Sequence, residues 1–145
     1  MRVISGKLKG RKIEGYDISG TRPTMDRVKE SIFGMIQGNV PNAIVLDLFS
    51  GSGNYGIECI SNGSEKAYFN DYNIKCVKVI KDNLINMNVL DQSIITNMDY
   101  KKAMEYYKKE NIKFDLVFLD PPYKKHIIND ILDYLVNNNL LNNNG

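Results

Sequence analysis

One uninterrupted apolar run constrains the fold of this chain more than any other feature. Residues 43–49 read Ala-Ile-Val-Leu-Asp-Leu-Phe, and a glycine-rich turn follows at residues 50–53. An apolar run of this kind, without polar alternation, is typical of a strand buried on both faces of a parallel sheet. Glycines after such a strand let the backbone turn sharply. The sequence therefore predicts a central unit of strand, tight turn and helix.

The rest of the chain continues this alternation. Further strands are predicted at 66–70, 92–96 and 114–119, and helices at 55–61, 73–87, 100–109 and 126–136. A first helix is predicted to begin at Thr24 and to be stopped by Gly38, with Val28, Ile32, Met35 and Ile36 as its apolar stripe. Strands that alternate with helices indicate an α/β fold, in which a parallel sheet carries helices on both faces.

The chain of 145 residues divides into two parts. Residues 1–23 are predicted to form a basic arm or small hairpin, and residues 24–145 a single domain. The last residues, 142–145, read as a turn into another strand. A sheet of four strands would leave its last strand as a long apolar edge, which is a liability. We therefore expect that strands completing the sheet are missing from this chain.

Arginine is concentrated in the arm. Lysine outnumbers arginine 15 to 4, yet all four arginines lie within the first 27 residues. A guanidinium can bind a phosphate through two parallel hydrogen bonds, so this distribution favours a polyanionic partner over an ordinary solvated basic face. The basic residues of this segment are Arg2, Lys7, Lys9, Arg11, Lys12, Arg22, Arg27 and Lys29.

Composition excludes several classes of protein. Hydrophobic residues make up 43% and charged residues 25%, as in globular proteins. No apolar run approaches the ~20 residues of a membrane span, and the N-terminus has no signal-peptide core. A cytoplasmic protein without a membrane partner is expected. Cys59 and Cys76 form no CxxC motif, so neither a metal site nor a disulfide framework is predicted, and both side chains are expected to be buried.

The glycine-rich turn is the first candidate for ligand binding. Gly51, Gly53 and Gly56 fit the spacing GxGxxG of dinucleotide-binding proteins, but Asp47 lies four residues before the first glycine. A carboxylate at this place suits a cationic ligand better than a pyrophosphate. The amino group and sulfonium of S-adenosylmethionine fit this description, and Phe49 belongs to the same motif. A tight turn without a ligand is the alternative.

Two further acids follow strands at the same edge. Asp71 comes about twenty residues after the turn, where an acid typically accepts hydrogen bonds from ribose hydroxyls. Asp99 could accept from an adenine amine. Either residue could instead cap the helix that follows it.

The sequence Asp120-Pro121-Pro122-Tyr123 carries the most chemical information. Proline has no N–H group and a fixed φ, so a carboxylate and a rigid proline carbonyl offer two acceptors and no donor. Such a pair suits an NH₂ group on a ring, and Tyr123 offers a face on which that ring can stack. An ordinary turn has no need for this combination.

Together these motifs resemble a known family. Residues 47–53 with residues 120–123 are similar to Rossmann-like class I S-adenosylmethionine-dependent methyltransferases that act on exocyclic amines. The segments Arg2–Gly6, Lys9–Arg11, Arg22–Thr24 and Arg27–Glu30 with Phe33 resemble the RsmD family, whose members methylate guanine N2 in bacterial small-subunit ribosomal RNA. Lys29 and Gly34 stand where that family usually has Arg and Asn, and Asp71 replaces the more common Glu.

The resemblance implies an enzyme that methylates the exocyclic N2 of a guanine, with S-adenosylmethionine as cofactor and ribosomal RNA as partner, free or in an assembling small-subunit particle. A monomer is expected. The alternatives are a DNA adenine-N6 or cytosine-N4 methyltransferase and a non-catalytic RNA-binding relative. The candidate residues are catalytic Asp120, Pro121, Pro122 and Tyr123; cofactor-binding Asp47, Phe49, Gly51, Gly53, Asp71 and Asp99; and RNA-binding Arg2, Lys9, Arg11, Arg22 and Arg27.

Overall fold

The fold is built around one parallel sheet. The computed structural model describes residues 1–15, 23–121 and 125–145, with the backbone alone for 23–25, 125 and 126. Four strands pair in the order β3-β2-β1-β4, and every pairing is parallel. The strands are β1 (Ile44–Asp47), β2 (Lys66–Asn70), β3 (Ser93–Thr96) and β4 (Leu116–Phe118).

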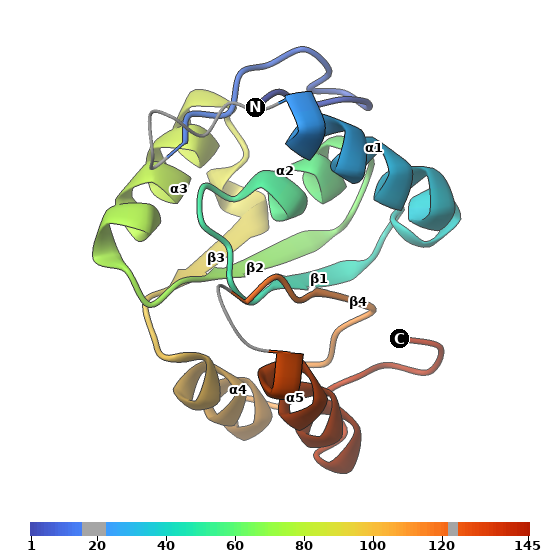
Figure 1. The fold of residues 1–145 in the computed structure, drawn as a ribbon, viewed down its shortest axis with the longest axis vertical. Helices are drawn as coiled ribbons and strands as arrows, with labels where there is room; N and C mark the ends of the chain where they lie inside the picture. Colours follow the sequence, from blue (N-terminus) through green and yellow to red (C-terminus); the bar gives the residue numbers. More distant parts are fainter. Residues whose placement is uncertain (16–22, 122–124) are drawn as a thin grey trace.

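The helices cover the two faces of this sheet, as Figure 1 shows. α1, α2 and α3 lie on one face, and α4 and α5 lie on the other. They are α1 (Pro23–Ile36), α2 (Asn54–Ser61), α3 (Ile74–Asn86), α4 (Tyr100–Lys109) and α5 (Lys125–Asn137). The predicted α/β fold and the predicted order of strands and helices are confirmed.

The two layers of helices bury two hydrophobic clusters. Neighbouring residues of a strand point to opposite faces, so Val45 belongs to the cluster under α1–α3, whereas Leu46 belongs to the cluster above α4 and α5. Both side chains have no exposed surface. Burial on both faces is the physical reason why the β1 sequence shows no polar alternation. The predicted burial of Cys59 and Cys76 is also confirmed.

The order in which the strands are added to the sheet reverses between β1 and β4. From β1 to β3, each new strand is added at the same edge of the sheet. The chain then returns to the opposite edge, where β4 pairs with β1. The helices that follow β1 and β4 therefore leave on opposite faces (Figure 1). In open α/β sheets, the carboxyl ends of strands at such a reversal are where ligands bind.

The first helix differs from its prediction. α1 begins at Pro23, one residue before the predicted start at Thr24, and proline is favoured at a first helical position. Met35 and Val28, predicted to lie in the apolar stripe, are 80% and 48% exposed, whereas Phe33 is buried. The buried face also includes Lys29, with no exposed surface. The inner face of α1 therefore differs from the predicted apolar stripe, because Lys29 occupies part of it.

The described part of the N-terminal arm is a small hairpin seated on α2. Arg2 and Lys12 form an antiparallel bridge, and Met1, Val3 and Ile13 are buried in the cluster under α1–α3. Gly6 has φ +84, and a Cβ atom there would lie 2.0 Å from the carbonyl oxygen of Ser61. Glycine is therefore required where this hairpin meets α2.

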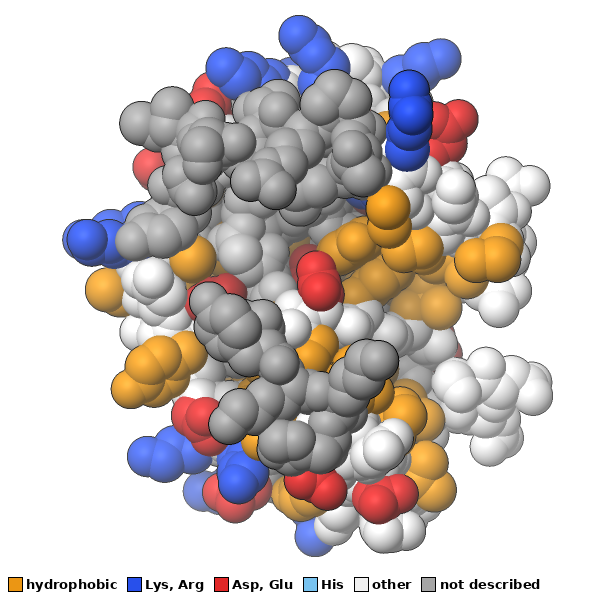
Figure 2. All heavy atoms as spheres, viewed as in Figure 1, with side chains coloured by type: hydrophobic (Ala, Val, Ile, Leu, Met, Phe, Trp, Pro, Cys, Tyr) orange, Lys and Arg blue, Asp and Glu red, His pale blue; other side chains and the backbone are white. Residues whose placement is uncertain are grey.

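The far side of β4 carries the start of a further pairing. Leu141 forms a parallel bridge to Phe114, and the Asn142 N–H donates to the Phe114 carbonyl at 2.9 Å. Next to this edge, Phe118 stacks between Phe33 and Tyr55 at ring-centroid distances of 5.7 and 5.1 Å. Hydrophobic side chains gather over this region in Figure 2.

Two helical glycines allow a matched test of the packing between α2 and β2. A Cβ atom at Gly56 would lie 2.3 Å from Cε1 of the buried Phe69, whereas a Cβ atom at Gly34 would meet nothing within 4 Å. We expect Gly56→Ala to lower the free energy of unfolding by about 1–3 kcal/mol through overpacking. Gly34→Ala should raise it by about 0.5–1 kcal/mol, because alanine favours the helix. Urea denaturation measures both, and equal effects would contradict this packing.

Candidate functional site

The candidate site is a cleft of about 430 Å³ at the carboxyl ends of the strands. It lies beside the point where β1 and β4 diverge, because residues that follow both strands line it. Five of the predicted site residues come together there, from four separate segments of the chain: Phe49, Gly51, Asp71, Asp99 and Asp120.

The glycine-rich turn forms one wall of the cleft. Gly51 and Gly53 have φ +59 and +88, values that side-chain-bearing residues seldom adopt, and α2 begins at the next residue. The Gly53 N–H donates to the Ser50 carbonyl at 2.8 Å, which closes the turn. The backbone N–H of Gly51 points to Asp71 and donates to its Oδ2 at 2.9 Å. The turn is thus fixed by an acid from the neighbouring strand.

Asp71 supports the start of α3 and also lines the cleft, so its helix-capping position leaves the predicted ribose-binding role open. Its Oδ1 accepts from the Asn73 N–H at 2.9 Å, just before α3, while its side chain lines the cleft. Asp99 likewise caps α4 by accepting from the Lys101 N–H at 3.1 Å and also lines the cleft. A carboxylate has about four acceptor positions, so each acid keeps capacity to accept from a ligand.

Asp47 lies beneath the turn and is not among the described residues that line the cleft. It is 2% exposed, and its Oδ2 accepts from the Gly56 N–H at 3.1 Å. Burial raises the pKa of Asp47 to about 7; the hydrogen bond from Gly56 and the nearby Ser50 hydroxyl oppose the rise, and the nearby carboxylates of Asp120 and Asp71 add to it. Gly53 is likewise buried and does not line the cleft.

Asp120 lies two residues after the end of β4, and its exposed side chain lines the cleft. Pro121 comes next and is half-buried. Pro122 and Tyr123, the other two predicted catalytic residues, lie outside the described residues. The structure therefore brings the predicted carboxylate to the same cleft as the predicted cofactor residues, which come from a distant part of the chain.

A buried amide that the sequence analysis did not single out joins three segments around the cleft. Asn70, at the end of β2, donates from Nδ2 to the carbonyls of Leu48 and Met98 at 3.2 and 3.0 Å. Its Oδ1 accepts from the Thr96 hydroxyl at 2.8 Å. One side chain thus ties together the segments that follow β1, β2 and β3. Its only signal in the sequence is a polar residue at the end of an apolar strand, a position shared with Asp47.

The predicted RNA-binding residues are exposed wherever the structure describes their side chains. Arg2, Lys9, Arg11 and Arg27 are exposed, whereas Arg22 lies outside the described residues. Arg2 Nη1 donates to the Gly10 carbonyl at 3.1 Å, and Arg11 Nη2 donates to the Asn86 carbonyl at 2.8 Å. An arginine has five N–H donors, so each retains donors that face solvent. Basic side chains gather at the upper edge of Figure 2, where the arm and the start of α1 lie.

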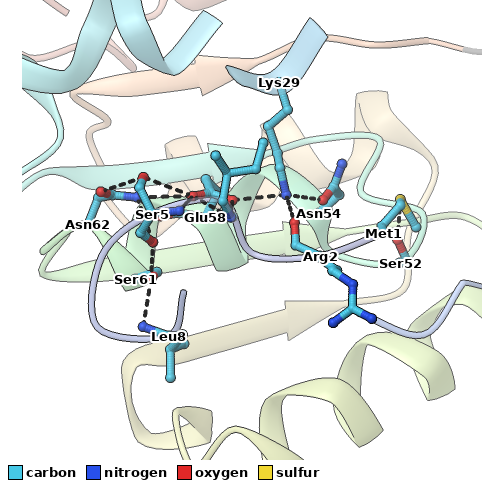
Figure 3. A network of polar contacts seen from close by, with 12 residues as sticks. Met1, Arg2, Ser5, Leu8, Lys29, Ser52, Asn54, Glu58, Ser61 and Asn62 are labelled. Carbon is cyan, nitrogen blue, oxygen red and sulfur yellow. Dashed lines mark hydrogen bonds and ion pairs between the residues drawn. The ribbon is translucent and has the colours of Figure 1, made fainter. Parts of the chain in front are cut away.

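Lys29, which the sequence analysis counted among the basic residues of this segment, does not belong to the exposed basic surface. Its ammonium lies 2.9 Å from Glu58 Oε1, and neither side chain has any exposed surface (Figure 3). A buried charge is retained only when it is paired and hydrogen-bonded, so Lys29 has a structural partner in place of a ligand. Nothing in the sequence links residues 29 and 58.

Two features bear on other classes of site. Among the described residues, no group of three or more His, Cys, Asp and Glu side chains is arranged to hold a metal ion. In the same part of the chain, every helix is too short or too polar to cross a bilayer.

Comparisons with known proteins agree with this geometry. The family model described as conserved hypothetical protein 95 matches residues 1–145. YlbH of Bacillus subtilis (strain 168) is 38% identical over 145 residues, which cover 100% of this chain and 79% of YlbH. Ribosomal RNA small subunit methyltransferase D of Buchnera aphidicola subsp. Acyrthosiphon pisum is 32% identical over 93% of this chain and 69% of its own length.

The fold is also that of a solved structure. The protein yhhF of Escherichia coli superposes with a TM-score of 0.84 and 27% sequence identity, covering 98% of this chain and 75% of its own. The similarity therefore extends over the N-terminal arm as well as the sheet.

The buried carboxyl of Asp47 should make stability depend on pH. Because its pKa is about 7 in the folded protein against an ordinary 3.8, the folded state binds the proton more tightly. The free energy of unfolding should therefore fall as pH rises from about 4 to 7, by an amount on the order of 4 kcal/mol. Asp47→Asn cannot ionise and should lack this decline, while its amide oxygen still accepts from Gly56.

Urea denaturation between pH 4 and pH 8 measures the difference between the two proteins. Asp82→Asn, which changes an exposed carboxylate on α3, is the matched control and should follow the wild type. Parallel curves for Asp47→Asn and wild type would contradict the raised pKa.

Proposed function

The chain belongs to the RsmD family, matched over its full length by the model described as conserved hypothetical protein 95, and we propose that it methylates small-subunit ribosomal RNA with S-adenosylmethionine as cofactor. One observation carries the proposal. The glycine-rich turn, Asp71 and Asp120 meet in a single cleft at the reversal of the sheet. A relative with 32% identity is named ribosomal RNA small subunit methyltransferase D.

The residues of the cleft fit the proposed cofactor. Asp71 and Asp99 offer carboxylate oxygens for hydroxyl and amine groups, and Gly51 has no side chain to keep a ligand from the backbone. Leu48, Phe49 and other largely apolar side chains line the same cleft. The carboxylates also suit a ligand that carries positive charge. When bound, S-adenosylmethionine supplies the methyl group from its sulfonium.

We propose guanine N2 as the acceptor because of the chemistry at the end of β4. Its amine lone pair is delocalised into the ring, which makes the nitrogen a poor nucleophile. The Asp120 carboxylate and the Pro121 carbonyl would accept its two hydrogens and aim the lone pair into the cleft. Orientation of this kind can supply up to about 7–11 kcal/mol of the barrier in favourable cases. The base must leave its stack to reach the cleft, which costs a few kcal/mol.

We further propose that residues 1–23 and residues 24–145 bind different ligands. Phosphates of the RNA would bind to exposed basic side chains of the arm and of α1, namely Arg2, Lys9, Arg11 and Arg27. The sheet and its carboxyl-terminal loops would hold the cofactor and the base. Arg22, Pro122 and Tyr123 are assigned by their sequence motifs.

Radiolabelled methyl transfer tests the activity. The substrates are small-subunit ribosomal RNA, small-subunit particles and DNA, all from a strain that lacks this protein. Nucleoside analysis then identifies the labelled base. We expect label in N2-methylguanosine. Label in adenine N6 or cytosine N4 of DNA would replace the proposal by a DNA methyltransferase. Cofactor binding without transfer to any substrate would indicate a non-catalytic relative.

Asp120 should be needed for methyl transfer more than for cofactor binding. Asp120→Asn keeps the shape but can present an NH₂ donor to the substrate amine, so turnover should fall by about 10²–10³-fold. The dissociation constant of S-adenosylmethionine should change little. Asp133→Asn, an exposed acid on α5, is the matched control. Near wild-type turnover in Asp120→Asn would exclude the proposed hydrogen bonds.

The arm arginines should determine the salt dependence of RNA binding. Each phosphate contact that is lost should reduce the slope of log K against log salt by about one. The double variant Arg11→Ala/Arg27→Ala should therefore bind RNA with a slope smaller by about two. Lys109→Ala, at an exposed position on α4, should keep the wild-type slope. An unchanged slope in the double variant would mean that these arginines do not contact phosphates.

A further inference from the structure

Two buried side chains each join the N-terminal arm to the glycine-rich turn of the cleft or to the residue that directly follows it. The first is Lys29 of α1, shown in Figure 3. Its Nζ donates to the Arg2 carbonyl at 2.8 Å and to Asn54 Oδ1 at 2.7 Å. Asn54 is the first residue of α2 and directly follows the turn. With Glu58 at 2.9 Å as the third partner, all three N–H groups of the ammonium are used.

The second is Asn83 of α3, which is 2% exposed. Its Nδ2 donates to the Glu14 carbonyl and to the Ser52 carbonyl, both at 3.0 Å. Its Oδ1 accepts from the Glu14 N–H at 3.1 Å. Glu14 lies where the described part of the arm ends, and Ser52 lies within the turn. Lys29 and Asn83 therefore form the same kind of bridge from two different helices.

Glu58 of α2 fixes the arm to this arrangement. Its Oε1 accepts from the Ile4 N–H at 2.9 Å as well as from Lys29, and its Oε2 accepts from the Ser5 N–H at 3.0 Å. Displacement of the arm would thus remove partners from a buried carboxylate and from a buried ammonium together. The three side chains that connect the arm to this region, Lys29, Glu58 and Asn83, are at most 2% exposed.

We propose that Lys29 and Asn83 are positioning residues that couple RNA binding on the arm to cofactor binding in the cleft. The inference rests on the proposed function, because it assigns RNA to the arm and the cofactor to the turn. RNA that binds the seated arm stabilises the bridges. The bridges hold Ser52 and Asn54, and hence the turn, in the form that faces the cofactor. The two ligands therefore favour the same arrangement of the chain.

Linkage makes this coupling reciprocal. If RNA raises the affinity for the cofactor by a given factor, the cofactor raises the affinity for RNA by the same factor. Couplings of this kind usually lie between about 5-fold and 150-fold. A residue that merely stabilises the fold would change the free energy of unfolding without changing this factor.

Calorimetry on the full chain tests the proposal. The dissociation constant of S-adenosylhomocysteine, which permits no methyl transfer, is measured alone and with a saturating fragment of small-subunit ribosomal RNA. In the wild type we expect the RNA to tighten binding at least about fivefold. In Lys29→Met the factor should fall to about one. Lys29→Arg, which retains the charge and the donors, should restore it.

Two further variants make the result decisive. Asn83→Ala leaves the Lys29–Glu58 pair intact, and in this variant the factor by which RNA tightens cofactor binding should also fall to about one. This variant therefore tests the proposal if Lys29→Met does not fold. Lys12→Met removes an exposed lysine of the same arm and should keep the wild-type factor.

A folded Lys29→Met or Asn83→Ala variant with the wild-type factor would overturn the inference. A wild-type factor of one, with both ligands bound, would overturn it too while leaving the proposed function intact. Failure of the wild type to bind S-adenosylhomocysteine at all would refute the proposed function itself, and the inference with it.

Discussion

The buried pair of Lys29 and Glu58 is the interaction on which the N-terminal half of the structure depends. It lies where the arm, α1 and α2 meet, and both of its charged side chains have no exposed surface. Removing one partner of such a pair costs about 3–5 kcal/mol, a large share of the ~5–15 kcal/mol that stabilises a typical domain. The arm is therefore part of the fold and differs from an appended tail.

The cleft results from a second constraint, the need to satisfy polar groups where parallel strands end. β1 and β4 are neighbours at the reversal of the sheet, and the regular strand pairing ends where the loops that follow them begin. Asp47, Asn70 and Asp71 supply the missing hydrogen bonds from within the sheet, to Gly56, to the Leu48 and Met98 carbonyls, and to Gly51. Of these three side chains, Asn70 and Asp71 also line the cleft, whereas Asp47 lies behind it.

The sequence was sufficient for the order of elements and for the meeting of Gly51, Asp71 and Asp120, since parallel strands bring their carboxyl ends to one edge. It failed for the inner face of α1, because hydrophobic periodicity assigns a lysine to solvent and cannot reveal that Lys29 has a partner at residue 58. It also missed Asn83, whose role depends on contacts with residues 31 and 69 positions away. Such long-range polar pairings leave no local pattern.

The acids around the cleft have a consequence for any polynucleotide that approaches it. Asp71, Asp99 and Asp120 line the opening, while the exposed arginines lie apart from it, around the arm. The cleft therefore repels phosphate groups over roughly a Debye length, about 8 Å at physiological ionic strength. A neutral base is not repelled in this way, whereas the phosphates of its own nucleic-acid backbone are. In the proposed reaction, charge would thus separate the two parts of a nucleotide before any atom of the base is recognised.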